Sequence, residues 1–248
     1  MARKSRVRLR KLRDEVARAH PSIPDPDVAI VRGRITVDGF VVLNPATLVR
    51  ESAAIALLID EPLRGEAKLK AALAAFEIGV ADRIALDIGA AAGGFTRVLV
   101  NAGARRVYAV DAGYGQLLGS LRQDARVVNL EGTNLGELNV EIVTDVIELV
   151  TLDLSYLALS EAVPQLEGVR LARCADAVAL VKPQFELGLR APPHHRAELI
   201  DAVSKARRAF VSMGWRVPEW IESPRRGRRG SVEFLLHATR GGGHLAAR

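Results

Sequence analysis

From residue 63 to residue 239 the chain alternates short apolar runs with amphipathic segments. The segment AKLKAALAAFEI has helical spacing, which places Leu69, Leu73 and Phe76 on one face. Seven apolar runs read as strands, with helix-like segments between them: RIALDI, RVYAVD, RVVNLE, VIELVTLDL, AVALVK, WRVPEWIE and SVEFLLHA. This alternation predicts an α/β fold, a mostly parallel seven-stranded sheet with helices on both faces.

The first sixty residues follow a different pattern. The segment SRVRLRKLRDEVARAH reads as a basic helix, and three prolines between residues 21 and 26 then interrupt the chain. Between Ile30 and Val42 apolar residues recur at strand-like spacing around Asp38-Gly39, which is a strong hairpin signal. We therefore expect a small domain at 1–60, a linker at 61–65, the α/β domain at 66–240 and a flexible tail at 241–248.

Composition is that of an ordinary globular protein, with 49% hydrophobic and 26% charged residues among 248. No uncharged apolar run reaches the roughly 18 residues that a membrane span needs, and the basic start lacks the apolar segment of a secretory signal. Cys174 is the only cysteine, which excludes an internal disulfide and a cysteine metal cluster. We expect a cytoplasmic protein without a metal site or membrane contact.

Positive charge is clustered along the chain, whose net charge is +6. Residues 1–18 hold eight Lys or Arg, and PRRGRRG spans residues 224–230. Such clusters favour a phosphate-rich partner such as RNA, although a solvated terminus and a solvated loop would look the same. The candidate RNA-binding residues are Arg6, Arg8, Arg10, Lys11, Arg225, Arg226, Arg228 and Arg229.

A glycine-rich turn, ALDIGAAAGGFT, follows the first strand of the α/β domain. Its sequence from Gly89 to Gly94 lacks the second glycine of the dinucleotide motif G-x-G-x-x-G, so it suits a ligand without pyrophosphate. S-adenosylmethionine is such a ligand, and Asp111 after the second strand could accept from its ribose hydroxyls. Because ligands bind at the carboxyl ends of parallel strands, the charges that close four strands predict one polar crevice: Asp87, Asp111, Asp153 and Lys182.

Several stretches together resemble the TlyA family of ribosomal-RNA 2′-O-methyltransferases, which are related to FtsJ-type enzymes and often labelled haemolysins. They are DIGAAAGGFTRVLVNAGARRVYAVDAGYGQL, LRQDARVV, EGTN, LDLSYLALSEAVPQL, LVKPQFE and SPRRGRRGSVEFLL. The resemblance covers about residues 30–238. It implies a Rossmann-like methyltransferase domain that uses S-adenosylmethionine, with ribosomal RNA or a ribosomal subunit as partner.

The N-terminal segment resembles the alpha-L RNA-binding motif. The positions that fit its turn are Gly33, Ile35, Val37, Asp38 and Gly39. The helical part fits less well, because the proline-rich insert interrupts it. Without the resemblance, this segment could equally be a small capping subdomain.

The resemblance also implies the site residues. FtsJ-type enzymes use a Lys-Asp-Lys-Glu set, here Lys68, Asp153, Lys182 and Glu233. A lysine amine can take the proton of a ribose hydroxyl only if its pKa falls from about 10.4. Helical periodicity alone does not distinguish Lys68 from Lys70. The expected cofactor residues are Asp87, Gly89, Ala90, Gly93, Gly94, Phe95, Asp111, Ala112, Asn134 and Asp153.

The chain departs from the family pattern in three places. LGLRAPPHHRAE replaces a glycine- and lysine-rich stretch, LRGEAKL replaces SRGGLKL, and EGTN replaces ERTN. These changes affect segments expected to meet RNA, so they put the substrate in doubt more than the reaction. Three alternatives stay open: a catalytically idle RNA-binding protein, a cytolysin, and a small-molecule methyltransferase.

Overall fold

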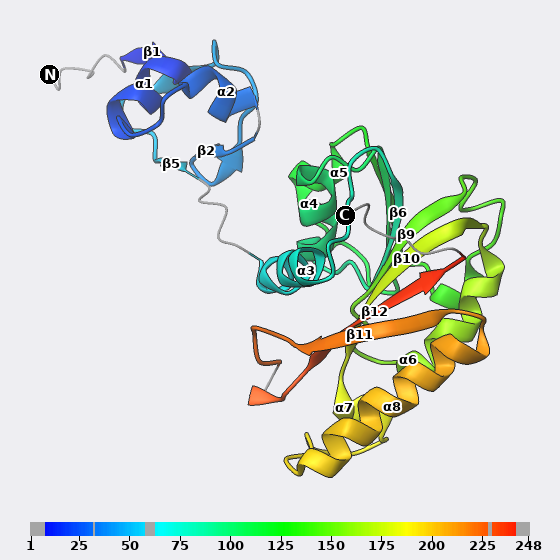
Figure 1. Ribbon diagram of the computed structural model, residues 1–248. Helices are drawn as coiled ribbons and strands as arrows, with labels where there is room; N and C mark the ends of the chain where they lie inside the picture. Colours follow the sequence, from blue (N-terminus) through cyan, green and yellow to red (C-terminus); the bar gives the residue numbers. More distant parts are fainter. Residues whose placement is uncertain (1–7, 32, 58–62, 228–229, 242–248) are drawn as a thin grey trace, which may run out of the picture. The chain divides into compact units, whose positions relative to one another are not determined.

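The computed structural model describes residues 8–31, 33–57, 63–227 and 230–241. The chain divides into two compact units, Met1–Glu61 and Pro62–Arg248, which are coloured blue and cyan-to-red in Figure 1.

The first unit contains short elements around a small apolar core. They are β1 (Leu9–Lys11), α1 (Leu12–Ala19), α2 (Pro26–Val31), β2 (Ile35–Val37), β3 (Phe40–Val41), β4 (Leu48–Arg50) and β5 (Ile55–Leu57). Strands β2 and β3 form the predicted hairpin, and Asp38 and Gly39 have positive φ angles of 50° and 86°, as a tight hairpin turn requires. The core includes Leu12, Val16 and Ile30.

The predicted basic helix is shorter than expected, because its first part is a strand. Leu9–Lys11 pairs antiparallel with β4, and α1 begins only at Leu12. The proline-rich insert ends at Pro26, which is the first residue of α2. Proline fits there because the first turn of a helix needs no backbone N–H donor.

The second unit is built on one seven-stranded sheet. Its elements are α3 (Arg64–Ala75), β6 (Ile84–Ile88), α4 (Gly94–Asn101), β7 (Arg106–Asp111), α5 (Gly119–Arg122), β8 (Val127–Glu131), the 3₁₀ helix η1 (Leu135–Glu137), β9 (Ile147–Leu152), α6 (Leu159–Ala162), the 3₁₀ helix η2 (Val163–Gly168), β10 (Leu171–Val181), α7 (Pro183–Glu186), α8 (Arg196–Ser212), β11 (Arg216–Glu222) and β12 (Phe234–Arg240). The strand order is β11-β12-β10-β9-β6-β7-β8. Strands β8, β7, β6, β9 and β10 are parallel, and β12 runs antiparallel to its neighbours β10 and β11. The predicted fold class is confirmed.

Alternation along the central strand explains why helices cover both faces. In β6, Leu86 and Ile88 belong to the core shared with α8, whereas Ala85 belongs to the core shared with α3 and α4. Figure 1 shows α8 on one side of the sheet and α3 and α4 on the other. Fully burying a leucine or isoleucine side chain stabilises the fold by about 1.5–3 kcal/mol, so two such cores hold the sheet firmly.

The strand order also fixes where a ligand can bind. Strand β6 lies between β7 and β9, so the connections after β6 and β9 leave the sheet at neighbouring points. Parallel α/β sheets bind ligands at such a switch point, beyond the carboxyl ends of the strands. Two boundaries differ from expectation: α3 begins at Arg64, inside the expected linker, and β12 begins at Phe234, so Glu233 precedes the strand.

Candidate active site

A cavity of about 630 Å³ opens at the carboxyl edge of the sheet. This volume lies within the range of about 300–1,000 Å³ typical of small-molecule sites. Its walls come from the start of α3, the glycine turn, the ends of β9 and β10, and the segment before β12. All four residues expected to be catalytic line it: Lys68, Asp153, Lys182 and Glu233.

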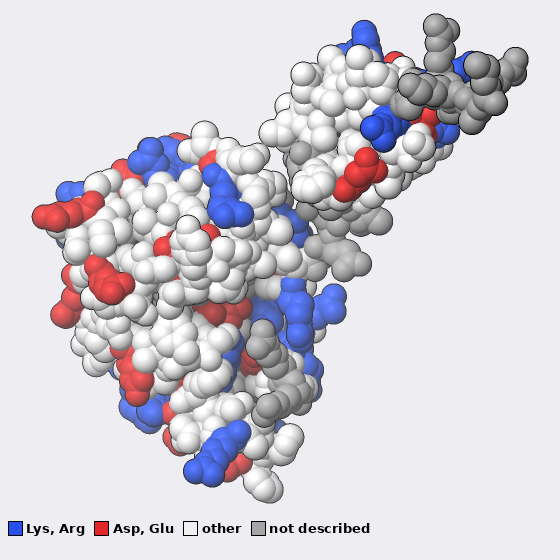
Figure 2. All heavy atoms as spheres, turned by 180° about the vertical axis from the view of Figure 1, so that it is seen from behind, with Lys and Arg blue, Asp and Glu red and all other residues white. Residues whose placement is uncertain are grey.

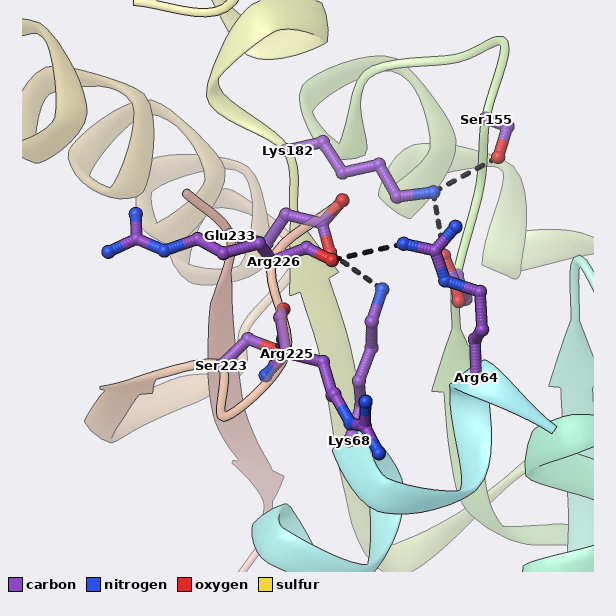
Figure 3. Close-up of polar contacts among 9 residues, drawn as sticks. Arg64, Lys68, Ser155, Lys182, Ser223, Arg225, Arg226 and Glu233 are labelled. Atoms are coloured by element: carbon purple, nitrogen blue, oxygen red, sulfur yellow. Dashed lines mark hydrogen bonds and ion pairs between the residues drawn. The ribbon is translucent and has the colours of Figure 1, made fainter. Parts of the chain in front are cut away.

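Lys182 and Asp153 form the first ion pair of the cavity. The Lys182 Nζ lies 2.7 Å from Asp153 Oδ1 and donates a hydrogen bond of 3.0 Å to Ser155 Oγ. The two residues directly follow β10 and β9, which are adjacent parallel strands. The amine therefore has two acceptors from a single loop and a fixed position (Figure 3).

Lys68 and Glu233 form the second pair, at a distance of 2.6 Å between Nζ and Oε2. Both residues are buried, with 7% and 5% exposure, and leaving either charge without its partner would be costly. Lys70, on the same helix, is instead exposed and pairs with Glu66 at 3.1 Å. The structure thus distinguishes Lys68 from Lys70, which helical periodicity alone could not do.

Gly227 lies directly against the side chain of Glu233 in the segment before β12. A Cβ added to Gly227 would collide with the carboxylate of Glu233 and the hydroxyl of Ser231. The loop closes on itself through a hydrogen bond of 2.8 Å from the Gly227 backbone N–H to the Ser231 carbonyl. Sequence reasoning missed Gly227, because its segment stood out only for its charge.

The glycine turn brings bare backbone to the cavity. Gly89 has φ +84°, and a Cβ there would lie 2.6 Å from the carbonyl oxygen of Asp153. Gly93 has φ +95°, and its Cβ would collide with Leu121 and Leu117. Of the expected cofactor residues, Gly89, Ala90, Gly94, Phe95 and Asp153 line the cavity.

Asp87, one of the cofactor residues expected from the sequence, does not line this cavity. Its side chain is fully buried, and its oxygens accept hydrogen bonds from Thr96 Oγ1 at 2.6 Å and Thr151 Oγ1 at 2.8 Å. Burial raises the pKa of the Asp87 carboxyl to about 6, against the effect of both hydroxyls. Asp87 therefore joins β6, α4 and β9 behind the turn.

Asp111 lies at the edge of the turn. Its Oδ2 accepts from the backbone N–H of Ala91 at 2.8 Å, and its Oδ1 accepts from that of Gly113 at 2.7 Å. A carboxylate has further lone pairs, so it can still accept from a ligand hydroxyl. The Thr133 N–H donates to the Asp111 carbonyl at 3.0 Å, and neither Ala112 nor Asn134 lines the cavity.

The cavity is also lined by residues that the sequence prediction did not include, among them Arg64, Gly65, Gln184, Phe185, Pro192 and Pro193. The two prolines belong to the stretch LGLRAPPHHRAE, which departs from the family pattern. The departure from the family pattern was the only feature of the sequence that marked these two prolines. Nothing else in the stretch indicated that it lies beside the catalytic residues.

The expected RNA-binding residues lie in both units. Arg8, Arg10 and Lys11 are exposed in the first unit, where Arg10 pairs with Glu51 at 2.7 Å. Arg225 and Arg226 are exposed in the second, and Arg6, Arg228 and Arg229 lie outside the described residues. Figure 2 shows Lys and Arg side chains on the side of the second unit where the β11–β12 hairpin projects in Figure 1.

In the described part of the chain, no group of three or more His, Cys, Asp or Glu residues is placed to hold a metal ion. Nor does any described helix have the length and apolar character needed to cross a bilayer.

Known proteins resemble both the sequence and the fold. The family described as FtsJ-like methyltransferase matches residues 63–240. A Mycobacterium tuberculosis protein named 16S/23S rRNA (cytidine-2′-O)-methyltransferase TlyA is 41% identical over 95% of this chain and 90% of its own. Hemolysin A of Brachyspira hyodysenteriae is 32% identical over 84% and 90%, respectively. A solved structure from Streptococcus thermophilus that carries a hemolysin name has a TM-score of 0.69 and 29% identity, over 95% of this chain and 90% of its own.

Proposed function

Because the chain belongs to the FtsJ-like methyltransferase family, we propose that it transfers a methyl group from S-adenosylmethionine to a ribose 2′-hydroxyl of ribosomal RNA. The observation that carries this proposal is the meeting of two lysine–carboxylate pairs in one cavity beside a glycine turn. The M. tuberculosis relative, named for this reaction, matches nearly the whole chain.

The cavity fits S-adenosylmethionine on the side of the turn. Gly89 and Gly94 present backbone without side chains there. Asp111, which holds the backbone of Ala91 beside them, would accept hydrogen bonds from the ribose hydroxyls of the ligand. When bound, this cofactor supplies an electrophilic methyl group on a sulfonium. The expected role of Asp87 becomes indirect, because it holds the turn from behind.

The two lysines serve the incoming hydroxyl. Lys182 Nζ takes the proton from the ribose 2′-oxygen as this oxygen attacks, and Asp153 and Ser155 hold the amine in position. Lys68, paired with Glu233, lines the same cavity and serves to hold the hydroxyl in place beside Lys182. Alignment of hydroxyl and methyl supplies the other large part of the rate.

The first unit and the basic residues of both units serve RNA binding in this proposal. We propose that this unit is the alpha-L type domain, and the hairpin around Asp38-Gly39 supports this assignment. Ribosomal RNA as substrate implies a cytoplasmic location, and no step requires a metal ion or a membrane.

The test uses labelled S-adenosylmethionine with ribosomal RNA and isolated ribosomal subunits. Lys182→Met and Lys68→Met should each lower label transfer by about 10²–10⁴-fold, whereas Lys70→Met, on the same helix but exposed, should change it less than twofold. Lys68→Met leaves Glu233 buried without its partner, so the folding of this variant must be checked. Binding of S-adenosylmethionine by each variant provides that check. Wild-type protein that binds RNA but transfers no label would identify an idle RNA-binding protein. Transfer that survives Lys182→Met would refute the assigned base while leaving the reaction in place.

A further inference from the structure

The proposed reaction brings a negative charge into the cavity together with the target hydroxyl. In RNA, the carbon that bears the 2′-hydroxyl is bonded to the carbon that bears the 3′-phosphodiester. A site that receives this hydroxyl therefore also receives a phosphate group, and contacts to phosphate fix the register of a nucleic acid. This inference rests on the proposed function and concerns which residue meets that phosphate.

Among the residues that the structure describes, three cationic side chains line the cavity: Arg64, Lys68 and Lys182. Both lysines are already paired with carboxylates, at 2.6 Å and 2.7 Å. Arg64 is exposed, and within the described ranges it has no carboxylate at ion-pair distance. Its hydrogen bond runs from Nη2 to the backbone carbonyl of Arg226, at 3.4 Å, which is long for an N–H···O bond.

The position of Arg64 suits a group next to the reacting atoms. Figure 3 shows its guanidinium reaching from α3 toward the same space as the amines of Lys68 and Lys182. The guanidinium has five donors in a planar fork, and the weak bond to a carbonyl leaves most of them available. Such a fork binds phosphate oxygens in pairs.

Arg226 provides a contrast from the same part of the structure. Its guanidinium pairs with Glu222 at 3.3 Å, and in Figure 3 its side chain extends away from the lysine amines. Arg226 does not line the cavity, although its neighbour Gly227 does. Both arginines add positive charge near the site, but only Arg64 enters the cavity.

We propose that Arg64 binds the phosphodiester on the 3′ side of the target nucleotide. It is a substrate-binding residue that sets the place of the 2′-hydroxyl between the two lysines. The alternative anion is the carboxylate of the cofactor, and the experiment below separates the two.

The test measures binding of the dinucleotide CpC and of its uncharged methylphosphonate analogue, with S-adenosylhomocysteine present. Wild-type protein should bind the phosphate form about 10- to 100-fold more tightly, the range expected for hydrogen bonds to a charged group. Arg64→Gln should remove this preference, and Arg64→Lys should restore part of it. The matched control Lys70→Gln, at an exposed position of the same helix that does not line the cavity, should retain it. All variants should bind S-adenosylhomocysteine equally.

Three results would overturn the assignment. In the first, wild-type protein binds both dinucleotides equally or binds neither. In the second, Arg64→Gln still binds the phosphate form more tightly. In the third, Arg64→Gln no longer binds S-adenosylhomocysteine, which would assign Arg64 to the cofactor carboxylate. A phosphate preference that depends on Arg64, in a protein that methylates no RNA, would refute the proposed function and leave this assignment standing.

Discussion

Replacing Gly89 by alanine tests how the glycine turn and the catalytic loop depend on each other. The new Cβ would lie 2.6 Å from the carbonyl oxygen and 2.9 Å from the carbonyl carbon of Asp153. Both are backbone atoms, so the strand end that holds Asp153 must shift. Overpacking of this kind costs about 1–3 kcal/mol, and alanine at φ +84° costs about 1–2 kcal/mol more. Gly89→Ala should therefore lower the free energy of unfolding by about 2–5 kcal/mol.

Gly214→Ala is the matched control, because it separates backbone strain from collision. Gly214 has a similar φ of +78°, and a Cβ there would meet nothing within 4 Å. Only the strain of about 1–2 kcal/mol applies to it. Chemical unfolding followed by tryptophan fluorescence measures both variants in the second unit alone, because Trp215 and Trp220 are the only tryptophans of the chain.

The two variants should also differ in activity. Asp153 holds the amine of Lys182 in place. Gly89→Ala shifts Asp153 and should therefore lower methyl transfer. Gly214→Ala leaves Asp153 in place and should leave methyl transfer unchanged. Equal losses of stability in the two variants, with equal activity, would show that the close approach of Gly89 to Asp153 does not constrain the site.

Three further changes probe other parts of the site. Burial raises the pKa of Asp87 to about 6, so the folded protein retains a proton that the unfolded chain releases above about pH 3.9. The stabilisation contributed by this one group should fall by about 3 kcal/mol as pH rises from about 4 to 6. In urea unfolding at several pH values, wild type should therefore lose more stability over this range, relative to its value at the acidic end, than Asp87→Asn. Glu186 is buried and accepts a hydrogen bond from the backbone N–H of Leu159 at 2.5 Å. This bond connects the loop of Asp153 to the helix that follows Lys182. Glu186→Gln should lower kcat by about 3- to 10-fold with an unchanged KM for S-adenosylmethionine, and a change confined to KM would contradict this. Gly227→Ala should lower kcat, because the added Cβ displaces the Glu233 carboxylate that pairs with Lys68. Gly119→Ala, with open space around its Cβ, should match wild type in the same assay.

Much of the second unit could be predicted because its strands are short apolar runs with clear ends. The strand that ends before Asp153 and the strand that ends before Lys182 needed only the rule that parallel strands share one carboxyl edge. The sequence placed Glu233 inside a strand, and this was wrong. Apolar neighbours on both sides hid the point at which pairing with β10 begins, at Phe234.

Side-chain pairing was the part that local pattern could not supply. Lys68 and Lys70 are equivalent in helical periodicity, and only Glu233, 165 residues away, distinguishes them. The buried position of Asp87 depends on Thr151, on a strand that is adjacent only in the folded sheet. In the first unit, the basic composition of Leu9–Lys11 suggested helix, but pairing with β4 makes it a strand.

Nucleoside analysis of the RNA product tests the central claim most directly. Ribosomal RNA and ribosomal subunits are incubated with the protein and S-adenosylmethionine, digested to nucleosides and examined by mass spectrometry, with Lys182→Met as the parallel sample. The account predicts a 2′-O-methylated nucleoside in the wild-type sample and its absence with the variant. A nucleoside methylated on its base, or RNA that gains no methyl group from the wild-type protein, would contradict it.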